Sequence, residues 1–151
     1  MKIEHILVPI DFSEGSESAL CCALEMAEKF GSSLILFHVL TPLPAPVSDE
    51  GLPDTTSTDA FRQSAQKELD NLAQLIGTRI KVRTKVAAGV AWNEIVQFAK
   101  DDHASLIIMS THGRTGIRHA FLGSVAERVV RHAGCPVLVV RENEPLKLKA
   151  A

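Results

Sequence analysis

The sequence predicts a doubly wound α/β domain, with a mostly parallel five-stranded sheet covered by helices on both faces. Short apolar runs alternate along the chain with segments whose apolar residues recur at helical spacing. Most of the runs are apolar throughout, which is typical of parallel strands buried on both faces. Right-handed crossovers between such strands then produce a doubly wound sheet.

The first third of the chain predicts a strand, a helix and a second strand. The run Ile6-Leu7-Val8 ends at Pro9 and indicates the first strand. Ser13 is an expected N-cap for a helix whose apolar residues recur from 19 to 30, and Gly31 is its natural C-terminal stop. A buried strand follows at 34–39.

Residues 41–59 differ in composition from the segments around them. They contain four prolines and show little apolar periodicity, so we expect a mobile connector here. An amphipathic helix of about four turns is expected at 61–76. Residues 80–86 then alternate apolar and basic side chains, which favours a strand that is exposed on one face or lies at an edge of the sheet.

The last third predicts two helices and two strands. The apolar spacing of 92–99 indicates a helix, and 106–109 a buried strand. A segment rich in glycine, 110–124, leads into a further helix that bears Val125 and Val129. The uniformly apolar run 137–140 indicates the last strand.

Length, charge and cysteine content limit the class of protein. The chain has 151 residues, and we expect one domain over 1–144 with a short tail at 145–151. A formal net charge of −2 argues against a nucleic-acid partner. No apolar run approaches the length of a membrane span, and the N-terminal segment does not resemble a signal peptide. Three cysteines, an odd number, favour a reducing cytoplasmic location.

The small net charge conceals an uneven distribution. Residues 110–141 contain five arginines and one glutamate, for a local charge of +4. In the same segment Gly113 and Gly116 allow a close backbone approach, and Gly123-Ser124 opens a helix whose N-terminus favours an anion. Phosphate binding and an ordinary turn with a serine N-cap are both consistent with this segment.

Asp11 follows the first strand and has two interpretations. Its carboxylate could accept hydrogen bonds from a ribose or an adenine amine, or bind Mg²⁺, or it could bond its own backbone in a turn. Ligands of doubly wound sheets bind beyond the carboxyl ends of the strands, where the winding reverses. If the strands ending at Asp11 and at Met109 are neighbours, the acidic residue and the glycine loop face one crevice.

Several familiar catalytic signatures are missing from the sequence. There is no G-x-x-x-x-G-K-S/T, no G-x-G-x-x-G after the first strand and no G-x-S-x-G. No pair of histidines has zinc-ligand spacing with a third ligand nearby. A phosphoacceptor receiver domain is excluded because Asp11 has no acidic neighbour and the later strands lack the Asp and Lys that such domains need.

From Ile3 to Arg141 the chain resembles the universal stress protein family. The resemblance is carried by HILVPIDFSEGSESAL, LILFHV, the spacing of Val86, Gly89 and Ile95, LIIMSTHGRTG, and LGSVAERVVRHAGCPVLVV. It implies a Rossmann-like domain. Nucleotide-binding members carry G-x-x-G, then nine residues, then G-S/T. Gly113 and Gly123-Ser124 fit this spacing, whereas Ser110 occupies the position of the first glycine.

The resemblance also implies which residues surround a nucleotide. Pro9, Ile10 and Asp11 would lie near ribose and adenine, and Val39 would offer backbone hydrogen bonds to adenine. The ribose and phosphates would be lined by Met109, Ser110, Gly113, Arg114, Gly123, Ser124 and Val125, with His112 inside the loop. The implied ligand is ATP, with or without Mg²⁺.

The expected function is that of an ATP-binding, stress-response switch or sensor in the cytoplasm. No recognisable base or P-loop lysine is present, so at most slow ATP hydrolysis is expected. The resemblance implies a homodimer through the last strand, Val137–Val140, whose apolar edge would otherwise be a bare pairing template. The alternative is a nucleotide-free dimeric interaction module of the same fold, as some family members lack the glycine pattern.

Overall fold

The computed structural model describes residues 2–41, 55–111 and 122–141, which form a five-stranded parallel sheet with four helices. The strand order is β3-β2-β1-β4-β5, so the first strand of the chain is the central one. The predicted doubly wound α/β fold is confirmed. The elements are β1 (His5–Pro9), α1 (Glu14–Phe30), β2 (Ser33–Leu40), α2 (Thr55–Ile76), β3 (Val82–Ala88), α3 (Ala91–Asp101), β4 (Leu106–Ser110), α4 (Ser124–His132) and β5 (Val137–Val140).

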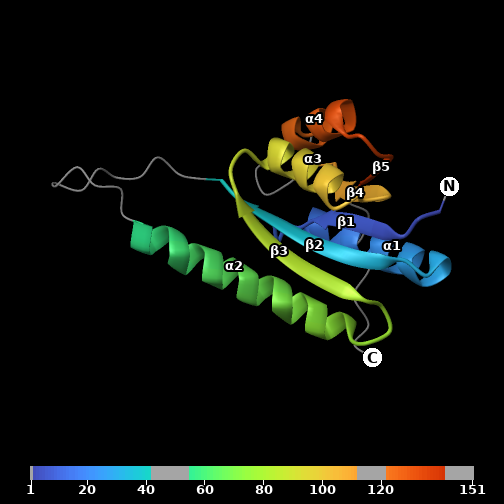
Figure 1. The fold of residues 1–151 in the computed structure, drawn as a ribbon, viewed down its shortest axis with the longest axis horizontal. Coiled ribbons are helices and arrows are strands. Elements are labelled where there is room, and N and C mark those ends of the chain that lie inside the picture. Colours follow the sequence, from blue (N-terminus) through green and yellow to red (C-terminus); the bar gives the residue numbers. More distant parts are fainter. Residues whose placement is uncertain (1, 42–54, 112–121, 142–151) are drawn as a thin grey trace.

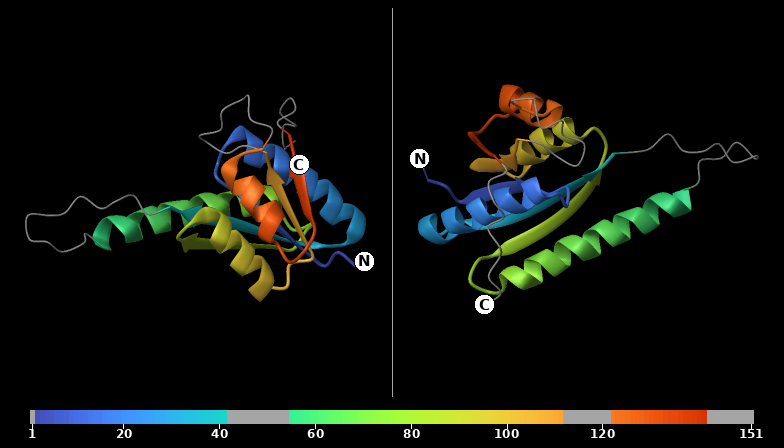
Figure 2. Two further views of the ribbon diagram at one scale, coloured as in Figure 1. Left: turned by 90° about the horizontal axis from the view of Figure 1, so that it is seen from above. Right: turned by 180° about the vertical axis from the view of Figure 1, so that it is seen from behind.

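The sheet separates two apolar cores, one on each face. Helices α1 and α2 cover one face, and α3 and α4 cover the other (Figures 1 and 2). Successive strand residues point to opposite faces, so Ile6 and Val8 enter the core under α1 and α2 while Leu7 enters the core under α3 and α4. This double burial explains why the inner strands are uninterrupted apolar runs.

Helix α1 begins and ends at the residues that the sequence indicates. The Ser13 hydroxyl accepts the Ser16 N–H at 3.2 Å and thereby caps the first turn. Gly31 ends the helix in the left-handed conformation, with φ +66°, which a residue without a Cβ adopts without steric cost.

Helix α2 begins earlier than expected. Its first residue is Thr55, not Phe61, so the last five residues of the proposed 41–59 connector are helical. The Thr- and Ser-rich start has no apolar periodicity because this end of α2 projects beyond the sheet (Figure 1), and Asp59, Ala60 and Phe61 are exposed. Residues 42–54 lie outside the described part of the chain. Within the described part, no helix combines the length and apolar character that a membrane crossing requires.

The two edges of the sheet have different character. Strand β3 is an edge strand, as its alternating pattern predicts, and it exposes Arg83 and Lys85. Arg83 forms a bidentate ion pair with Asp102 at the end of α3. Strand β5 forms the opposite edge and is apolar, with Leu138 exposed.

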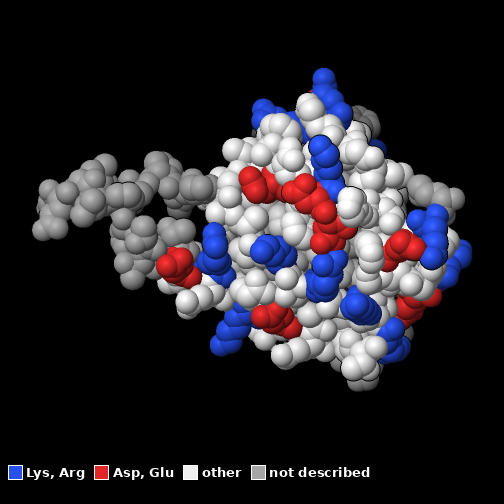
Figure 3. Space-filling view, in the orientation of Figure 1, with Lys and Arg blue, Asp and Glu red and all other residues white. Residues whose placement is uncertain are grey.

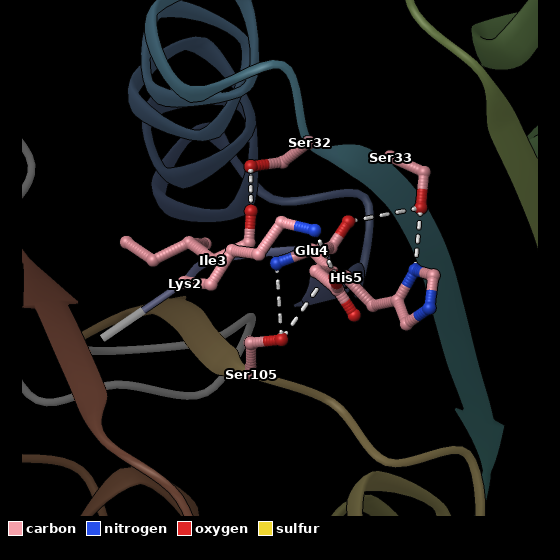
Figure 4. A network of polar contacts seen from close by, with 7 residues as sticks. All are labelled: Lys2, Ile3, Glu4, His5, Ser32, Ser33 and Ser105. Carbon is pink, nitrogen blue, oxygen red and sulfur yellow. Dashed lines mark hydrogen bonds and ion pairs between the residues drawn. The ribbon is translucent and has the colours of Figure 1, made fainter.

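A network of serines joins the N-terminal ends of β1, β2 and β4 (Figure 4). The Ser105 hydroxyl accepts the backbone N–H groups of Glu4 and His5 at 3.1 and 3.3 Å. On the other side of β1, His5 Nδ1 lies 2.8 Å from the Ser33 hydroxyl, and Ser32 donates to the carbonyl oxygen of Ile3 at 2.7 Å. These bonds hold the N-terminal ends of the three strands together, at the opposite end of the sheet from the predicted crevice.

Candidate functional site

The candidate site lies at the carboxyl ends of β1 and β4, which are neighbours in the sheet. Ile6 pairs with Leu106 and Leu7 with Ile107. The same register, continued to the strand ends, brings the residues after Pro9 beside Ser110. The winding of the sheet reverses between these two strands, and such a switch point is where α/β sheets bind their ligands. The strands that end near Asp11 and Met109 are therefore neighbours, which is the condition for both ends to face one ligand.

The N-terminus of α4 is held against the end of β4. The Gly123 N–H donates to the carbonyl oxygen of Thr111 at 2.7 Å, and the Thr111 N–H donates to that of Val140 at 2.9 Å. Gly123 is the N-cap of this nine-residue helix and makes no side-chain capping bond. The N–H groups of a helical first turn have no partner within the helix, and the helix dipole adds partial positive charge there. This end of α4 is thus suited to an anion.

Asp11 lies in the turn that joins β1 to α1. Its Oδ1 accepts the Ser13 N–H at 3.1 Å and also the Ser13 hydroxyl. Asp11 therefore bonds the backbone of its own turn, which is one of the two interpretations that the sequence allows. Contact of this half-buried carboxylate with a ligand stays a prediction.

Two residues support this turn from the core side, and sequence analysis gave neither a role. His38 Nδ1 lies 2.7 Å from the Ile10 carbonyl oxygen. The Phe12 ring contacts the His38 ring with centroids 4.9 Å apart, and Phe12 has φ +62°. The only hint in the sequence is that a histidine lies at the end of a strand that is otherwise apolar.

The structure brings most of the predicted residues to the carboxyl ends of the strands. Pro9 ends β1, Ile10 and Asp11 follow it, and Val39 lies near the end of β2 in the core under α3 and α4. Met109 and Ser110 end β4, and Gly123, Ser124 and Val125 begin α4. The remaining three, His112, Gly113 and Arg114, lie outside the described residues.

Two hollows of the described surface lie on the side of the sheet that α1 and α2 cover. One, of about 690 Å³, runs along α2 and β3 and is lined by Arg62, Lys67 and Lys85 together with Asp70. Figure 3 shows basic and acidic side chains interspersed over this face. The other, of about 220 Å³, lies between α1 and α2 and is bordered by Ile10 and Phe12, the two neighbours of Asp11.

The cysteines are not placed for nucleophilic chemistry. Cys21, Cys22 and Cys135 are free thiols. Burial is the main cause that raises the pKa of each above its ordinary value. A raised pKa keeps a thiol protonated at neutral pH, whereas a reactive cysteine requires the thiolate.

Fold and site together define a doubly wound α/β protein that has a helix N-terminus suited to an anion beside its topological switch point. The model of the universal stress protein family matches residues 2–141, and the chain belongs to that family.

Individual relatives agree with this assignment. The chain is 37% identical to universal stress protein MJ0531 of Methanocaldococcus jannaschii, over 92% of this chain and 82% of that protein. The structure of UspA from Lactobacillus plantarum matches with a TM-score of 0.81 at 25% identity, over 93% of this chain and 99% of that one. A universal stress protein from Archaeoglobus fulgidus, solved in complex with dAMP, shares the fold with a TM-score of 0.62 at 23% identity, over 92% and 98% of the two chains.

Proposed function

We propose that this protein binds an adenine nucleotide, ATP with or without Mg²⁺, at the carboxyl ends of β1 and β4. The observation that supports the proposal is the 2.7 Å bond from the Gly123 N–H to the Thr111 carbonyl oxygen, because it places the N-terminus of α4 beside the end of β4. A ligand with an anionic group and a polar body fits an anion site next to a carboxylate. The dAMP complex of the Archaeoglobus relative supports the choice of an adenine nucleotide.

In this proposal the nucleotide lies across the crevice with its phosphates toward α4. Backbone N–H groups at Ser124 and Val125 would hold the phosphates, and Asp11 would face the ribose. The backbone of Val39 would bond the adenine. If Mg²⁺ accompanies the nucleotide, the Asp11 carboxylate and phosphate oxygens are the ligand types that it prefers.

We further propose a cytoplasmic stress-response switch or sensor and not an efficient enzyme. The Asp11 carboxylate already accepts two bonds from Ser13, which limits its use as a general base. Nucleotide occupancy would instead be read by a second subunit or another protein. The proposed homodimer forms through β5, where Leu138 is exposed and no described strand pairs with the outer side.

Calorimetric titration and thermal melts with millimolar Mg-ATP test the binding claim. Wild-type protein is expected to bind and to melt at a higher temperature, since a ligand that binds the folded state stabilises it. Gly123→Trp places a bulky side chain at the N-terminus of α4 and should abolish both effects. Gly134→Trp is the matched control, because Gly134 is exposed at the other end of α4 and a Cβ there meets nothing within 4 Å. Binding that survives Gly123→Trp unchanged would contradict the proposal.

A nucleotide-free interaction module is the second candidate, and Ser110 favours it. A serine Cβ and hydroxyl stand at the end of β4, where nucleotide-binding members of the family have a glycine. Purified protein can be denatured and its supernatant analysed by chromatography for released adenine nucleotide. Released nucleotide, or titration with ATP to saturation, supports the first candidate. If no nucleotide is released and millimolar ATP does not bind, the second candidate is supported.

A further inference from the structure

The turn that carries Asp11 is held by His38, a residue near the carboxyl end of β2. His38 is a buried polar residue of β2, 9% exposed. Its neighbours Phe37 and Val39 pack in the core under α3 and α4, so its side chain lies on the face that α1 and α2 cover. Its Nδ1 lies 2.7 Å from the carbonyl oxygen of Ile10, the residue immediately before Asp11. A carbonyl oxygen can only accept, so Nδ1 carries the proton and His38 is the donor.

Both backbone polar groups of Ile10 are therefore engaged with β2. The Ile10 N–H donates to the Phe37 carbonyl oxygen at 2.8 Å, and the Ile10 carbonyl accepts from His38. The first bond continues the backbone pairing of β1 with β2. In the second, at the end of β1, the donor to the Ile10 carbonyl is a side chain and not a backbone N–H. The peptide plane that leads into Asp11 is thus held by a buried donor.

The residue on the other side of Asp11 is constrained as well. Phe12 has φ +62°, a left-handed conformation that residues with a Cβ rarely adopt. Its ring lies on His38, with centroids 4.9 Å apart. The same histidine therefore contacts both neighbours of Asp11, while Ser13 holds the carboxylate itself.

We infer that His38 is a positioning residue for Asp11: by holding Ile10 and Phe12 it orients the carboxylate toward the crevice between β1 and β4. This inference rests on the proposed nucleotide function and deepens it. His38 touches no ligand in this role and acts only through the turn. Asp11 then meets the ligand from a preformed position, which lowers the ordering cost of binding.

Three histidine variants separate positioning from simple stability. His38→Leu keeps the apolar volume but removes the donor, whereas His38→Asn retains an N–H near the position of Nδ1. His5→Leu is the matched control, because His5 makes a bond of similar length to Ser33 at the opposite edge of the sheet (Figure 4). We expect His38→Leu to weaken ATP binding about five- to tenfold in calorimetry. His38→Asn should recover most of that loss, and His5→Leu should leave the dissociation constant unchanged even if it lowers the melting temperature.

A double-mutant cycle with Asp11→Ala shows whether His38 acts through Asp11. In the Asp11→Ala background, His38→Leu should cause no further loss of affinity, whereas a general effect on folding would add to the first loss. Phe12→Gly gives an independent test, because glycine adopts positive φ freely and leaves the His38 bond to Ile10 in place. It should fold and bind ATP severalfold more weakly, as the turn loses its constraint.

The outcomes distinguish this inference from the proposed function. If wild-type protein does not bind ATP, the proposed function fails and the positioning role fails with it. If wild-type protein binds but folded His38→Leu and Phe12→Gly bind equally well, or if the losses from His38→Leu and Asp11→Ala simply add, the positioning role alone is overturned. Should His38→Leu fail to fold, Phe12→Gly and the cycle of Phe12→Gly with Asp11→Ala decide the question.

Discussion

Ser110 lies opposite Val140 in the parallel pairing of β4 with β5, at the last register position of both strands. The next residue, Thr111, donates its N–H to the Val140 carbonyl oxygen at 2.9 Å, so the ladder continues to the mouth of the crevice. The backbone at Ser110 is therefore held as a strand, and the residue carries a side chain where the glycine pattern of the family has none.

Ser110→Gly should raise the affinity for adenine nucleotide severalfold. Removing the Cβ lets a ligand approach the β4 backbone more closely. The same change should lower the free energy of unfolding by about 0.5–1 kcal/mol, because glycine loses more backbone entropy in a strand. Calorimetric titration and urea unfolding measure the two effects separately. Weaker binding by the glycine variant would show that the serine hydroxyl itself contacts the ligand.

Leu138→Glu should dissociate the proposed dimer. A charged side chain at the centre of β5 opposes pairing of this apolar edge with a second copy. Sedimentation equilibrium is expected to show a dimer for the wild type and a monomer for the variant. Val90→Glu is a suitable control, since Val90 is also an exposed apolar residue but precedes α3, away from β5. A Leu138→Glu dimer as tight as wild type would exclude β5 as the interface.

The outer surface and the inner face of α2 should differ sharply in their response to truncation. Leu69 is fully buried and Leu75 is 69% exposed on the same helix. Leu69→Ala should reduce the free energy of unfolding by about 2–5 kcal/mol through lost burial and a residual cavity. Leu75→Ala should change it by less than about 0.5 kcal/mol. Urea unfolding monitored by circular dichroism provides both values, and similar losses would contradict the described packing of α2.

The cysteines predict a loss of stability at alkaline pH. Burial raises the pKa of Cys21, Cys22 and Cys135, so the folded state holds these protons more tightly than the unfolded state. Their contribution is fully present below the ordinary thiol pKa of about 8.5 and is lost as the pH rises through the higher folded values. Urea unfolding at pH 7 and pH 9.5 should show this decrease, and a variant with all three residues changed to alanine should show less of it. Alkylation by iodoacetamide at pH 7.5 should be slow in the folded protein.

The sequence was sufficient for the fold because the strands are buried on both faces. An uninterrupted run such as 106–109 indicates a parallel strand, and the Lys and Arg alternation of β3 correctly marks an edge. The apolar periodicity predicts a start at Phe61, whereas α2 begins at Thr55. The first turns of α2 project beyond the sheet and have no apolar face to detect.

The candidate site was only partly accessible from sequence. Asp11 and Gly123-Ser124 can be located because strand ends and helix starts have recognisable patterns. The bond between His38 and Ile10 joins residues 28 positions apart, and it depends on the pairing of β1 with β2. A left-handed Phe12 has no sequence signal, because that conformation is imposed by the contacts around it and not by the residue type.

The central position of β1 has a consequence for synthesis of the chain on the ribosome. One side of β1 pairs with β2, which follows within about thirty residues, but the other side pairs with β4, about one hundred residues later. At translation rates of about 5–20 residues per second, that second side lacks its partner for roughly 5–20 s. During this interval β1 presents unpaired backbone and an apolar run to other nascent chains. We therefore expect chaperones to bind the nascent chain mainly after β2 has been synthesised and before β4 has been.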